Sequence, residues 1–283
     1  MNVQKLHDRP FFQPAKMYNL PLLKKIRSMK QIPNILTLSN LFCGTLAIIF
    51  ILHAPEYIAE FNGTEYTVTN PEPIYWASAL VVLAGVIDFF DGFAARLLKV
   101  TSPLGKELDS LADVVSFGVV PGMILFRLLR SAYLQTPDVF DVSYFNLAPA
   151  LLVPCFAAYR LAVFNLDTRQ SEHFIGVPTP AVGFLVASFP LIMLYNPYNL
   201  AQLLENVWIL YGIIALLCYL MVSPHPMISL KFKNFSLKDN WARFLLAALA
   251  IASIPLLKYA AVPFVFIVYV ALSLLAPPKA SRG

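Results

Sequence analysis

The sequence predicts an all-α integral membrane protein, a polytopic helical bundle of about eight transmembrane helices. Three observations favour this class. Of the 283 residues, 58% are hydrophobic and only 13% are charged, whereas about a quarter of the residues of a soluble domain are charged. The mean hydropathy is +0.67. Apolar stretches long enough to span a bilayer recur along the whole chain. We therefore expect membrane lipids as surroundings, and neither a separate soluble domain nor a nucleic-acid partner.

Each expected helix is an apolar run bounded by polar or charged residues. In chain order, the expected spans are 34–53, 74–98, 107–133, 146–166, 179–196, 205–223, 241–257 and 259–276. The last two are separated by very little, so a single re-entrant unit is an alternative. Three parts are expected: a basic N-terminal segment (1–31), the main transmembrane domain (32–235) and a C-terminal part with the last two helices (236–283).

The charges beside the helices predict the topology. Lys and Arg are frequent before the first helix and again near residues 99–106 and 231–243, whereas the loop 54–73 carries four glutamates and no Lys or Arg. This alternation places both termini in the cytoplasm. Arg127 and Arg130, near the outer end of the third helix, run against the pattern.

The segment before the first helix has its own pattern. In residues 20–30, apolar side chains are interleaved with Lys24, Lys25, Arg27 and Lys30. This indicates either an amphipathic helix on an anionic leaflet or a plain positively charged flank. The sequence Asn62-Gly63-Thr64 in the next loop is a glycosylation sequon, which matters only in a eukaryotic secretory setting.

Four carboxylates interrupt the second and third predicted helices. Asp88 and Asp91 lie near the cytoplasmic end of the second helix, and Asp109 and Asp113 lie in the first turns of the third, which returns from the same side. Helical spacing places these acids on two facing stripes, together with Gly92, Ala95, Arg96 and Gly105. Because acids at the edge of a bilayer are costly, such a cluster marks a functional site.

The chemistry of this cluster indicates divalent metal ions. Converging carboxylates repel one another unless cations lie between them. No Cys or His is nearby, so Mg²⁺, Mn²⁺ or Ca²⁺ fits better than zinc. Gly92 and Ala95 leave room for a ligand, and Arg96 can pair with phosphate. Two other interpretations stay open: a divalent-cation transporter, against which Arg96 argues, and a non-catalytic scaffold.

The eight residues follow the pattern D-x2-D-G-x2-A-R-x8-G-x3-D-x3-D. This resembles the signature of the CDP-alcohol phosphotransferases, membrane enzymes that move a phosphatidyl or similar group from a CDP-linked donor to an alcohol and release CMP. The resemblance implies that Asp88, Asp91, Asp109 and Asp113 bind two metal ions and that Asp113 is also the general base. It implies a homodimer as well, and a CDP site lined by Gly92, Ala95, Arg96 and Gly105.

Further segments resemble the phosphatidylserine synthases of that family. Residues 32–44 look like P-N-x-x-T-x-x-N-L-x-C-G, 160–165 like R-L-A-R-F-N with Val163 replacing the second Arg, 174–181 like F-x-G-L-P-T-P-A, and 219–231 like Y-L-M-V-S…S-x-K. The resemblance implies transfer from CDP-diacylglycerol to L-serine at the cytoplasmic face of the membrane. Glycerol 3-phosphate, inositol and choline remain alternative acceptors.

A serine site needs a cation for the carboxylate of the substrate. Arg160 lies near the depth of the aspartates and is predicted to bind that carboxylate, although a snorkelling arginine is an alternative. Asn165 and Thr179 are candidate acceptor contacts or caps. Asn34 and Thr37 are candidate contacts to the cytidine, or simply begin the first helix.

Overall fold

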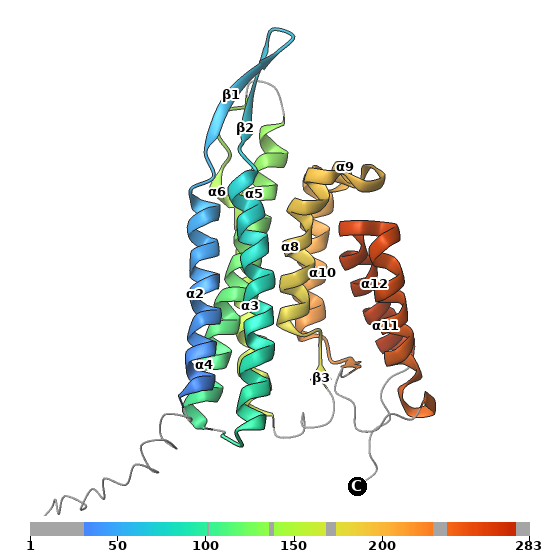
Figure 1. Ribbon diagram of the computed structural model, residues 1–283. Helices are drawn as coiled ribbons and strands as arrows, with labels where there is room; N and C mark the ends of the chain where they lie inside the picture. The colour runs from blue at the N-terminus through green and yellow to red at the C-terminus, as the bar shows by residue number, and fades with distance from the viewer. Residues whose placement is uncertain (1–30, 101, 136–138, 168–173, 229–236, 276–283) are drawn as a thin grey trace, which may run out of the picture.

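The computed structural model describes residues 31–100, 102–135, 139–167, 174–228 and 237–275 (Figure 1). The predicted amphipathic segment 20–30 lies outside this part of the chain. Five stretches of the described residues are long and apolar enough to cross a membrane. The first four contain α2 (Ile32–Leu52), α3 (Glu72–Leu97), α4 (Pro103–Val114) continuing through the π-helical turn η2 (Val115–Val119) into α5 (Val120–Leu134), and α6 (Tyr144–Leu147) continuing through η3 (Ala148–Leu151) into α7 (Leu152–Leu166).

The fifth stretch is a hairpin of two helices. α11 (Leu237–Leu257) and α12 (Ala261–Leu275) meet at the 3-10 turn η6 (Lys258–Ala260), where Lys258 has a φ of 50°. Figure 1 shows the two helices side by side at one flank of the bundle. The sequence prediction of two helices with a very short connection agrees with this arrangement.

Two predicted spans are shorter than expected. α8 (Thr179–Tyr195) has 17 residues and α10 (Val207–Val222) has 16, so at ~1.5 Å per residue each is about 25 Å long, against a bilayer core of about 30 Å. The short segments η5 (Pro197–Asn199) and α9 (Ala201–Leu204) connect them. All eight predicted segments contain helix, but only five stretches meet the length and hydropathy of a membrane span, and the count of eight spans remains a prediction.

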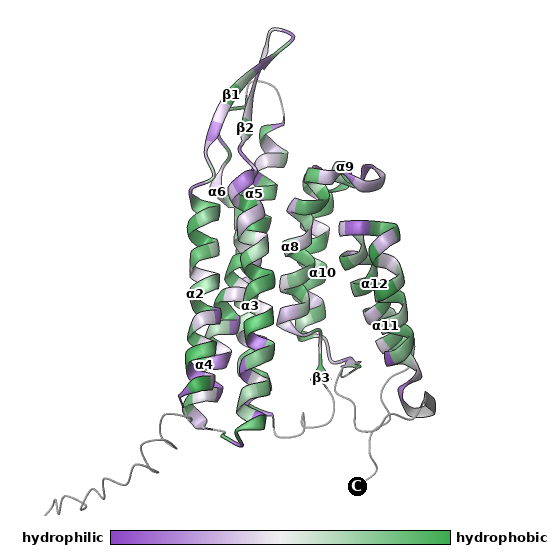
Figure 2. Cartoon of the chain, in the orientation of Figure 1, coloured by the Kyte–Doolittle hydropathy of each residue, from purple (hydrophilic) through white to green (hydrophobic). Residues whose placement is uncertain are grey.

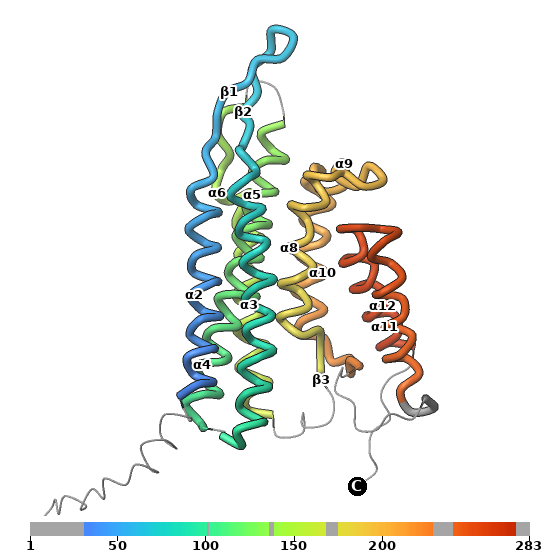
Figure 3. The backbone as a smooth tube through the Cα atoms, in the orientation of Figure 1, coloured from blue at the N-terminus to red at the C-terminus, as the bar shows by residue number. Residues whose placement is uncertain are grey.

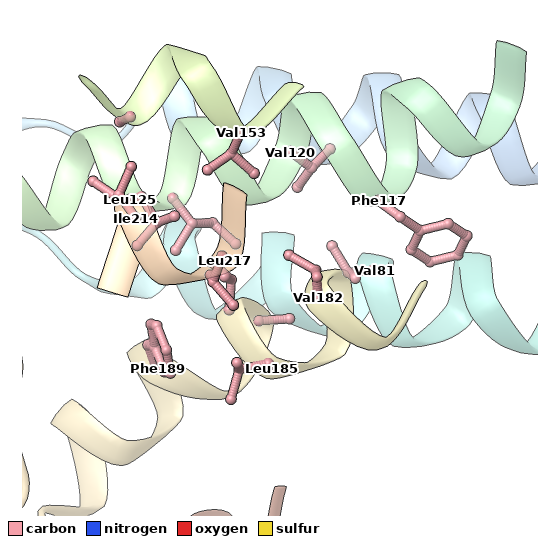
Figure 4. Close-up of a cluster of buried hydrophobic side chains, with 14 of the residues drawn as sticks. Val81, Phe117, Val120, Leu125, Val153, Val182, Leu185, Phe189, Ile214 and Leu217 are labelled. Carbon is pink, nitrogen blue, oxygen red and sulfur yellow. The ribbon is translucent and has the colours of Figure 1, made fainter. Parts of the chain in front are cut away.

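The helices pack into one bundle whose core lies between α3, η2, α5, α7, α8 and α10. The trace in Figure 3 shows α2 and α3 running side by side, with α8 and α10 between them and the α11–α12 hairpin. Figure 4 shows the buried side chains that meet at the centre: Val81, Phe117, Val120, Leu125, Val153, Val182, Leu185, Phe189, Ile214 and Leu217. Apolar side chains also cover much of the helix surface (Figure 2), as lipid contact requires.

Small residues let α2 and α8 approach the backbone of η2. A Cβ atom added to Gly44 of α2 would lie 2.5 Å from Ser116 Oγ, and one added to Gly183 of α8 would lie 2.8 Å from Phe117 Cδ1. Ser116 in turn donates a hydrogen bond of 3.1 Å to the Asn40 carbonyl. Close packing of this kind holds membrane helices together, and here it fixes the turn that directly follows Asp113.

The loop 54–73 contains a β-hairpin that the sequence analysis did not predict. β1 (Glu56–Phe61) pairs antiparallel with β2 (Thr64–Thr69), and Phe61 lies opposite Thr64. Asn62 and Gly63 between them have φ values of 53° and 75°, the conformation of the two-residue turns that Asn-Gly favours. The sequon is therefore the turn of this hairpin.

Arg127 and Arg130, the exceptions to the charge alternation, are paired with acids at the base of the hairpin. Glu56 Oε1 lies 2.8 Å from Arg130 Nε and 3.0 Å from Arg127 Nη1. Arg130 also reaches Asp141 at 3.3 Å, and Arg127 donates to the Ala54 carbonyl. The hydrogen bond from Arg130 and the positive charge of both arginines hold the pKa of Glu56 below its ordinary value, against the effect of burial.

Candidate active site

The predicted carboxylates converge at the end of the bundle opposite the β-hairpin. Asp88 and Asp91 come from the last third of α3 and Asp109 from α4, and their carboxylate oxygens lie within 4.8 Å of one another. Figure 2 shows hydrophilic residues along α4 and at this level of the otherwise apolar α3. Carboxylate oxygens at this spacing can hold a hard divalent ion.

Asp113 lies one turn further along α4 and is only 8% exposed. It is close enough to the other three aspartates to interact with them electrostatically, and Asn40 of α2 is beside it. Neither Asp113 Oδ1 nor either polar side-chain atom of Asn40 has a hydrogen-bond partner within the described part of the chain. Buried polar atoms are rarely left without partners, so this is a place where a bound ligand or ion would supply them.

The start of α4 sets the direction of its acidic stripe. Ser102 caps the helix, because its Oγ accepts a hydrogen bond of 2.9 Å from Gly105 N, and Pro103 occupies the first turn. Gly105, Asp109 and Asp113 then follow at intervals of four residues on one face. The cap therefore fixes where α4 begins, and Asp109 on this face reaches the Asp88 and Asp91 carboxylates.

A pocket of about 220 Å³ opens beside the carboxylates, between α2, the end of α3 and the start of α4. Its lining consists of Pro33, Asn34, Thr37, Asp91, Gly92, Ala95, Val100, Ser102, Gly105, Lys106 and Asp109. Five of the six residues predicted to contact CDP are in this set. The sixth, Arg96, is exposed, and its Nε donates to the Gly92 carbonyl at 3.0 Å. A Cβ atom at Gly92 would meet no atom within 4 Å, so the space beside it is open.

Thr37 is engaged by a carboxylate. Its Oγ1 lies 2.8 Å from Asp91 Oδ2 and donates a hydrogen bond to it. The sequence analysis assigned no role to Asn40 or Lys106. A signal for Asn40 was available, because Pro33, Thr37, Asn40 and Gly44 are buried at intervals of four, three and four residues and therefore form one face of α2.

Contacts between the helices place two of the acceptor candidates near Asp113. On α7, Ala157 lies against Gly118, and Asn165 donates a hydrogen bond of 2.8 Å to Ser110. Arg160 falls between these contacts and is close enough to Asp113 to interact electrostatically. On α8, Gly183 packs against Phe117, so Thr179, one turn earlier, lies near the level of Asp113.

The environments of the three acceptor candidates differ. Arg160 is 7% exposed, its Nε has no hydrogen-bond partner, and no carboxylate of the described residues lies within 4 Å of its guanidinium. Thr179 is fully buried, and its hydroxyl also lacks a partner there. Asn165 instead fastens α7 to α4, since its carbonyl accepts a hydrogen bond of 3.0 Å from Lys106 Nζ as well.

A carboxylate cluster beside a pocket at one end of a helical membrane bundle suits a site for divalent ions, such as those that enzymes of phosphoryl transfer use. The family model for CDP-alcohol phosphatidyltransferase matches residues 30–223. The chain belongs to this family, and it is a membrane-embedded enzyme.

Individual relatives cover much of the chain. The CDP-diacylglycerol–serine O-phosphatidyltransferase of Helicobacter pylori (strain J99) is 34% identical over 212 residues, which is 74% of this chain and 74% of the relative. The enzyme of the same name from Bacillus subtilis is 31% identical over 175 residues, 61% of this chain and 81% of the relative. The archaetidylserine synthase of Methanothermobacter thermautotrophicus is 28% identical over 189 residues, 66% and 69% of the two chains. The family resemblance predicted from the motif is confirmed.

Proposed function

We propose that this enzyme transfers the phosphatidyl group of CDP-diacylglycerol to the hydroxyl of L-serine and forms phosphatidylserine and CMP. The observation that carries the proposal is the cluster of Asp88, Asp91 and Asp109 beside a pocket that Asp91 and Asp109 line together with five predicted nucleotide contacts. The names of relatives from several organisms favour serine as the acceptor.

The four aspartates fit divalent metal ions. We propose that Asp88, Asp91, Asp109 and Asp113 hold two of them, Mg²⁺ or Mn²⁺, with Ca²⁺ as a third candidate. Such ions supply positive charge that stabilises the attacking and leaving oxygens during phosphoryl transfer. The unpartnered Oδ1 of Asp113 and the oxygens clustered within 4.8 Å support this assignment.

The other roles in the proposed reaction fall to residues of the chain. Asp113 accepts the proton of the serine hydroxyl, whose oxygen attacks the phosphorus attached to diacylglycerol, and CMP leaves. Thr37 orients the Asp91 carboxylate through its hydrogen bond. Gly92, Ala95 and Gly105 leave space for the nucleotide beside Asn34. Arg96 and Lys106 add positive charge near the diphosphate.

Arg160 has the properties needed to bind the serine carboxylate. A buried guanidinium without an anion is unfavourable, and within the described residues no carboxylate pairs with this one. A serine carboxylate would supply two acceptor oxygens in the planar geometry that arginine prefers. The unpartnered hydroxyl of Thr179 is a further contact for the same substrate, and Asn165 contributes by holding α7 against α4.

We propose further that the pocket faces the cytoplasm and that both termini lie there, because Lys99 and Lys106 lie at the aspartate end of the bundle and the basic residues 1–30 directly precede α2, which begins at that end. A homodimer remains a prediction. This orientation leaves the acyl chains of the donor in the bilayer while CMP and serine exchange with water.

The test is CMP release by the purified protein in mixed micelles of detergent and CDP-diacylglycerol with Mn²⁺. We expect release with L-serine, little release with glycerol 3-phosphate, inositol or choline, and none after chelation with EDTA until Mn²⁺ or Mg²⁺ is restored. Release that requires another alcohol would contradict the serine assignment. Release that survives complete chelation would contradict the metal assignment.

A further inference from the structure

The α11–α12 hairpin lies outside the residues that the family model matches, yet it packs against the acceptor side of the bundle. The family match ends at residue 223, and α12 contacts α8. A cavity of about 440 Å³ lies between them. Pro178 and Pro180, on either side of Thr179, line one wall, and Tyr269 of α12 lines another. Tyr269 therefore lies close to the start of α8.

Hydrogen bonds tie α12 to a two-stranded sheet whose first strand precedes α8. The short strands β3 (Phe174–Ile175) and β4 (Pro226–Met227) pair antiparallel. The amide of Ile228, directly after β4, donates a hydrogen bond of 3.1 Å to Ser273 Oγ, and Ser273 Oγ donates one of 2.7 Å to the Tyr269 carbonyl. The backbone that leads into Thr179 and the backbone of Tyr269 are thus held by one small network.

Tyr269 also lies near Arg160, which pairs with no carboxylate of the described residues. Tyr269 is 7% exposed, and its hydroxyl group is close enough to the Arg160 guanidinium to interact electrostatically, but no hydrogen bond joins the two side chains in the structure. A tyrosine hydroxyl can accept a hydrogen bond from one edge of a guanidinium and leave the other edge free for a carboxylate. Arg160 otherwise has Asp113 as its nearby titratable neighbour, and Asp113 is needed for the acceptor hydroxyl.

We propose that α12 completes the acceptor site and that Tyr269 is a positioning residue: when the amino-acid acceptor binds, the Tyr269 hydroxyl accepts a hydrogen bond from the Arg160 guanidinium and so orients it toward the acceptor carboxylate. The inference rests on the proposed function, because it assumes serine as the acceptor. It assigns the C-terminal hairpin a part in substrate selection.

The test compares Tyr269→Phe with Tyr259→Phe. Both variants remove one hydroxyl from the same hairpin, but Tyr259 lies in η6 at the opposite end of α12 and stacks on Tyr195 with ring centroids 4.6 Å apart. We expect Tyr269→Phe to raise the KM for L-serine about tenfold, the effect of one hydrogen bond to a charged group. The KM for CDP-diacylglycerol and kcat should change less than about twofold, and Tyr259→Phe should match the wild type.

A double-mutant cycle with Arg160→Lys tests whether Tyr269 acts through Arg160. If it does, Tyr269→Phe adds little to the serine KM of the Arg160→Lys enzyme, because the two changes remove the same interaction. Full additivity would overturn the positioning role. If Tyr269→Phe does not accumulate as a folded protein, Ser273→Ala replaces it, and the expected result is again a raised serine KM.

Two outcomes overturn the inference while leaving the proposed function intact. In one, the wild type releases CMP with serine but Tyr269→Phe has an unchanged serine KM. In the other, Tyr269→Phe raises only the KM for CDP-diacylglycerol, which would assign Tyr269 and its apolar cavity to the lipid. If the wild type shows no serine-dependent CMP release, the proposed function itself fails.

Discussion

Thr37 of α2 donates a hydrogen bond of 2.8 Å to Asp91 of α3, across 54 residues of sequence. This bond joins the first two long helices at the level of the carboxylate cluster. It occupies one acceptor position of the Asp91 carboxylate and favours one orientation of it, while the same hydroxyl lies 3.0 Å from the Pro33 carbonyl of its own helix. Partners of this kind commonly tune metal affinity.

Replacing Thr37 with Val should lower the affinity for the activating metal ion by about tenfold or more. Loss of a group that hydrogen-bonds to a metal ligand usually lowers metal affinity by that factor. The measurement is the Mn²⁺ concentration that gives half-maximal CMP release. Thr37→Ser keeps the hydroxyl and should stay near the wild type. Ser39→Ala is the matched control, because the Ser39 hydroxyl bonds only to the Ile35 carbonyl of its own helix at 2.9 Å. An unchanged Mn²⁺ requirement in Thr37→Val would contradict the orienting role.

Asp113→Asn should lower kcat by at least about 100-fold, because a positioned general base contributes 10²–10⁴-fold. Asparagine keeps the size of the side chain but cannot take the proton of the acceptor hydroxyl. Binding of Mn²⁺ and of CDP-diacylglycerol, measured by titration calorimetry in detergent, should be partly retained. Glu107→Gln, an exposed acid on the same helix, is the control and should leave kcat unchanged. Normal turnover by Asp113→Asn would show that Asp113 is not the general base.

Gly92→Ala should fold like the wild type and yet bind the nucleotide donor weakly. The added methyl group meets no protein atom within 4 Å, but Gly92 lines the pocket, so the methyl group occupies space that the ligand needs. We expect an unchanged unfolding temperature and a KM for CDP-diacylglycerol raised at least about tenfold, as a clash of this size costs 1–3 kcal/mol. Gly212→Ala is the control, because that position is also open but lies in α10, away from the pocket. Equal kinetics in both variants would place the nucleotide elsewhere.

Glu56→Gln should destabilise the protein by about 2–4 kcal/mol at neutral pH, because it leaves Arg127 and Arg130 without their shared carboxylate. The measurement is the unfolding midpoint in detergent. Glu60→Gln, on an exposed position of the same strand, should have almost no effect. Equal midpoints for the two variants would show that the hairpin is not anchored by this pair.

The same carboxylate predicts a pH dependence. Folding lowers the pKa of Glu56, so its stabilising contribution is fully present above the unfolded-state pKa of about 4.3. The contribution is lost as the pH falls through the lower, folded-state pKa. The difference in midpoint between the wild type and Glu56→Gln should therefore shrink as the pH is lowered below about 4. A midpoint difference that does not change with pH would show that Glu56 stabilises the protein through packing and not through its charge.

The carboxylate cluster could be predicted from the sequence because its aspartates lie within 26 residues of one another along the chain. Asp88 and Asp91 share a face through helical periodicity, and a connection of a few residues returns α4 beside α3 with Asp109 and Asp113 in its first turns. Asn40 belongs to the same site but comes from α2, and its contact with Asp113 depends on the packing of two helices far apart in the chain. Periodicity alone does not reveal such contacts.

Long-range pairing also explains what the sequence analysis left incomplete at the other end of the bundle. Arg127 and Arg130 ran against the charge pattern because their partner, Glu56, lies 71 and 74 residues away. The β-hairpin had a local signal, because Asn62-Gly63, interpreted above only as part of a sequon, is also a favoured two-residue hairpin turn. No sequence pattern marked Tyr269 as a candidate site residue, because the role proposed for it depends on where the C-terminal hairpin packs.

The π-helical turn η2 stands between Asp113 and the apolar segment of the same long helix. A π turn takes one residue more than the α-helical repeat, and each residue rotates a helix by about 100°. The extra residue therefore sets the angle between the acidic face of α4 and the core-facing side of α5. Deleting one residue from η2 would rotate α4 relative to α5. With α5 kept in the core, the acidic face of α4 would then turn away from its neighbours.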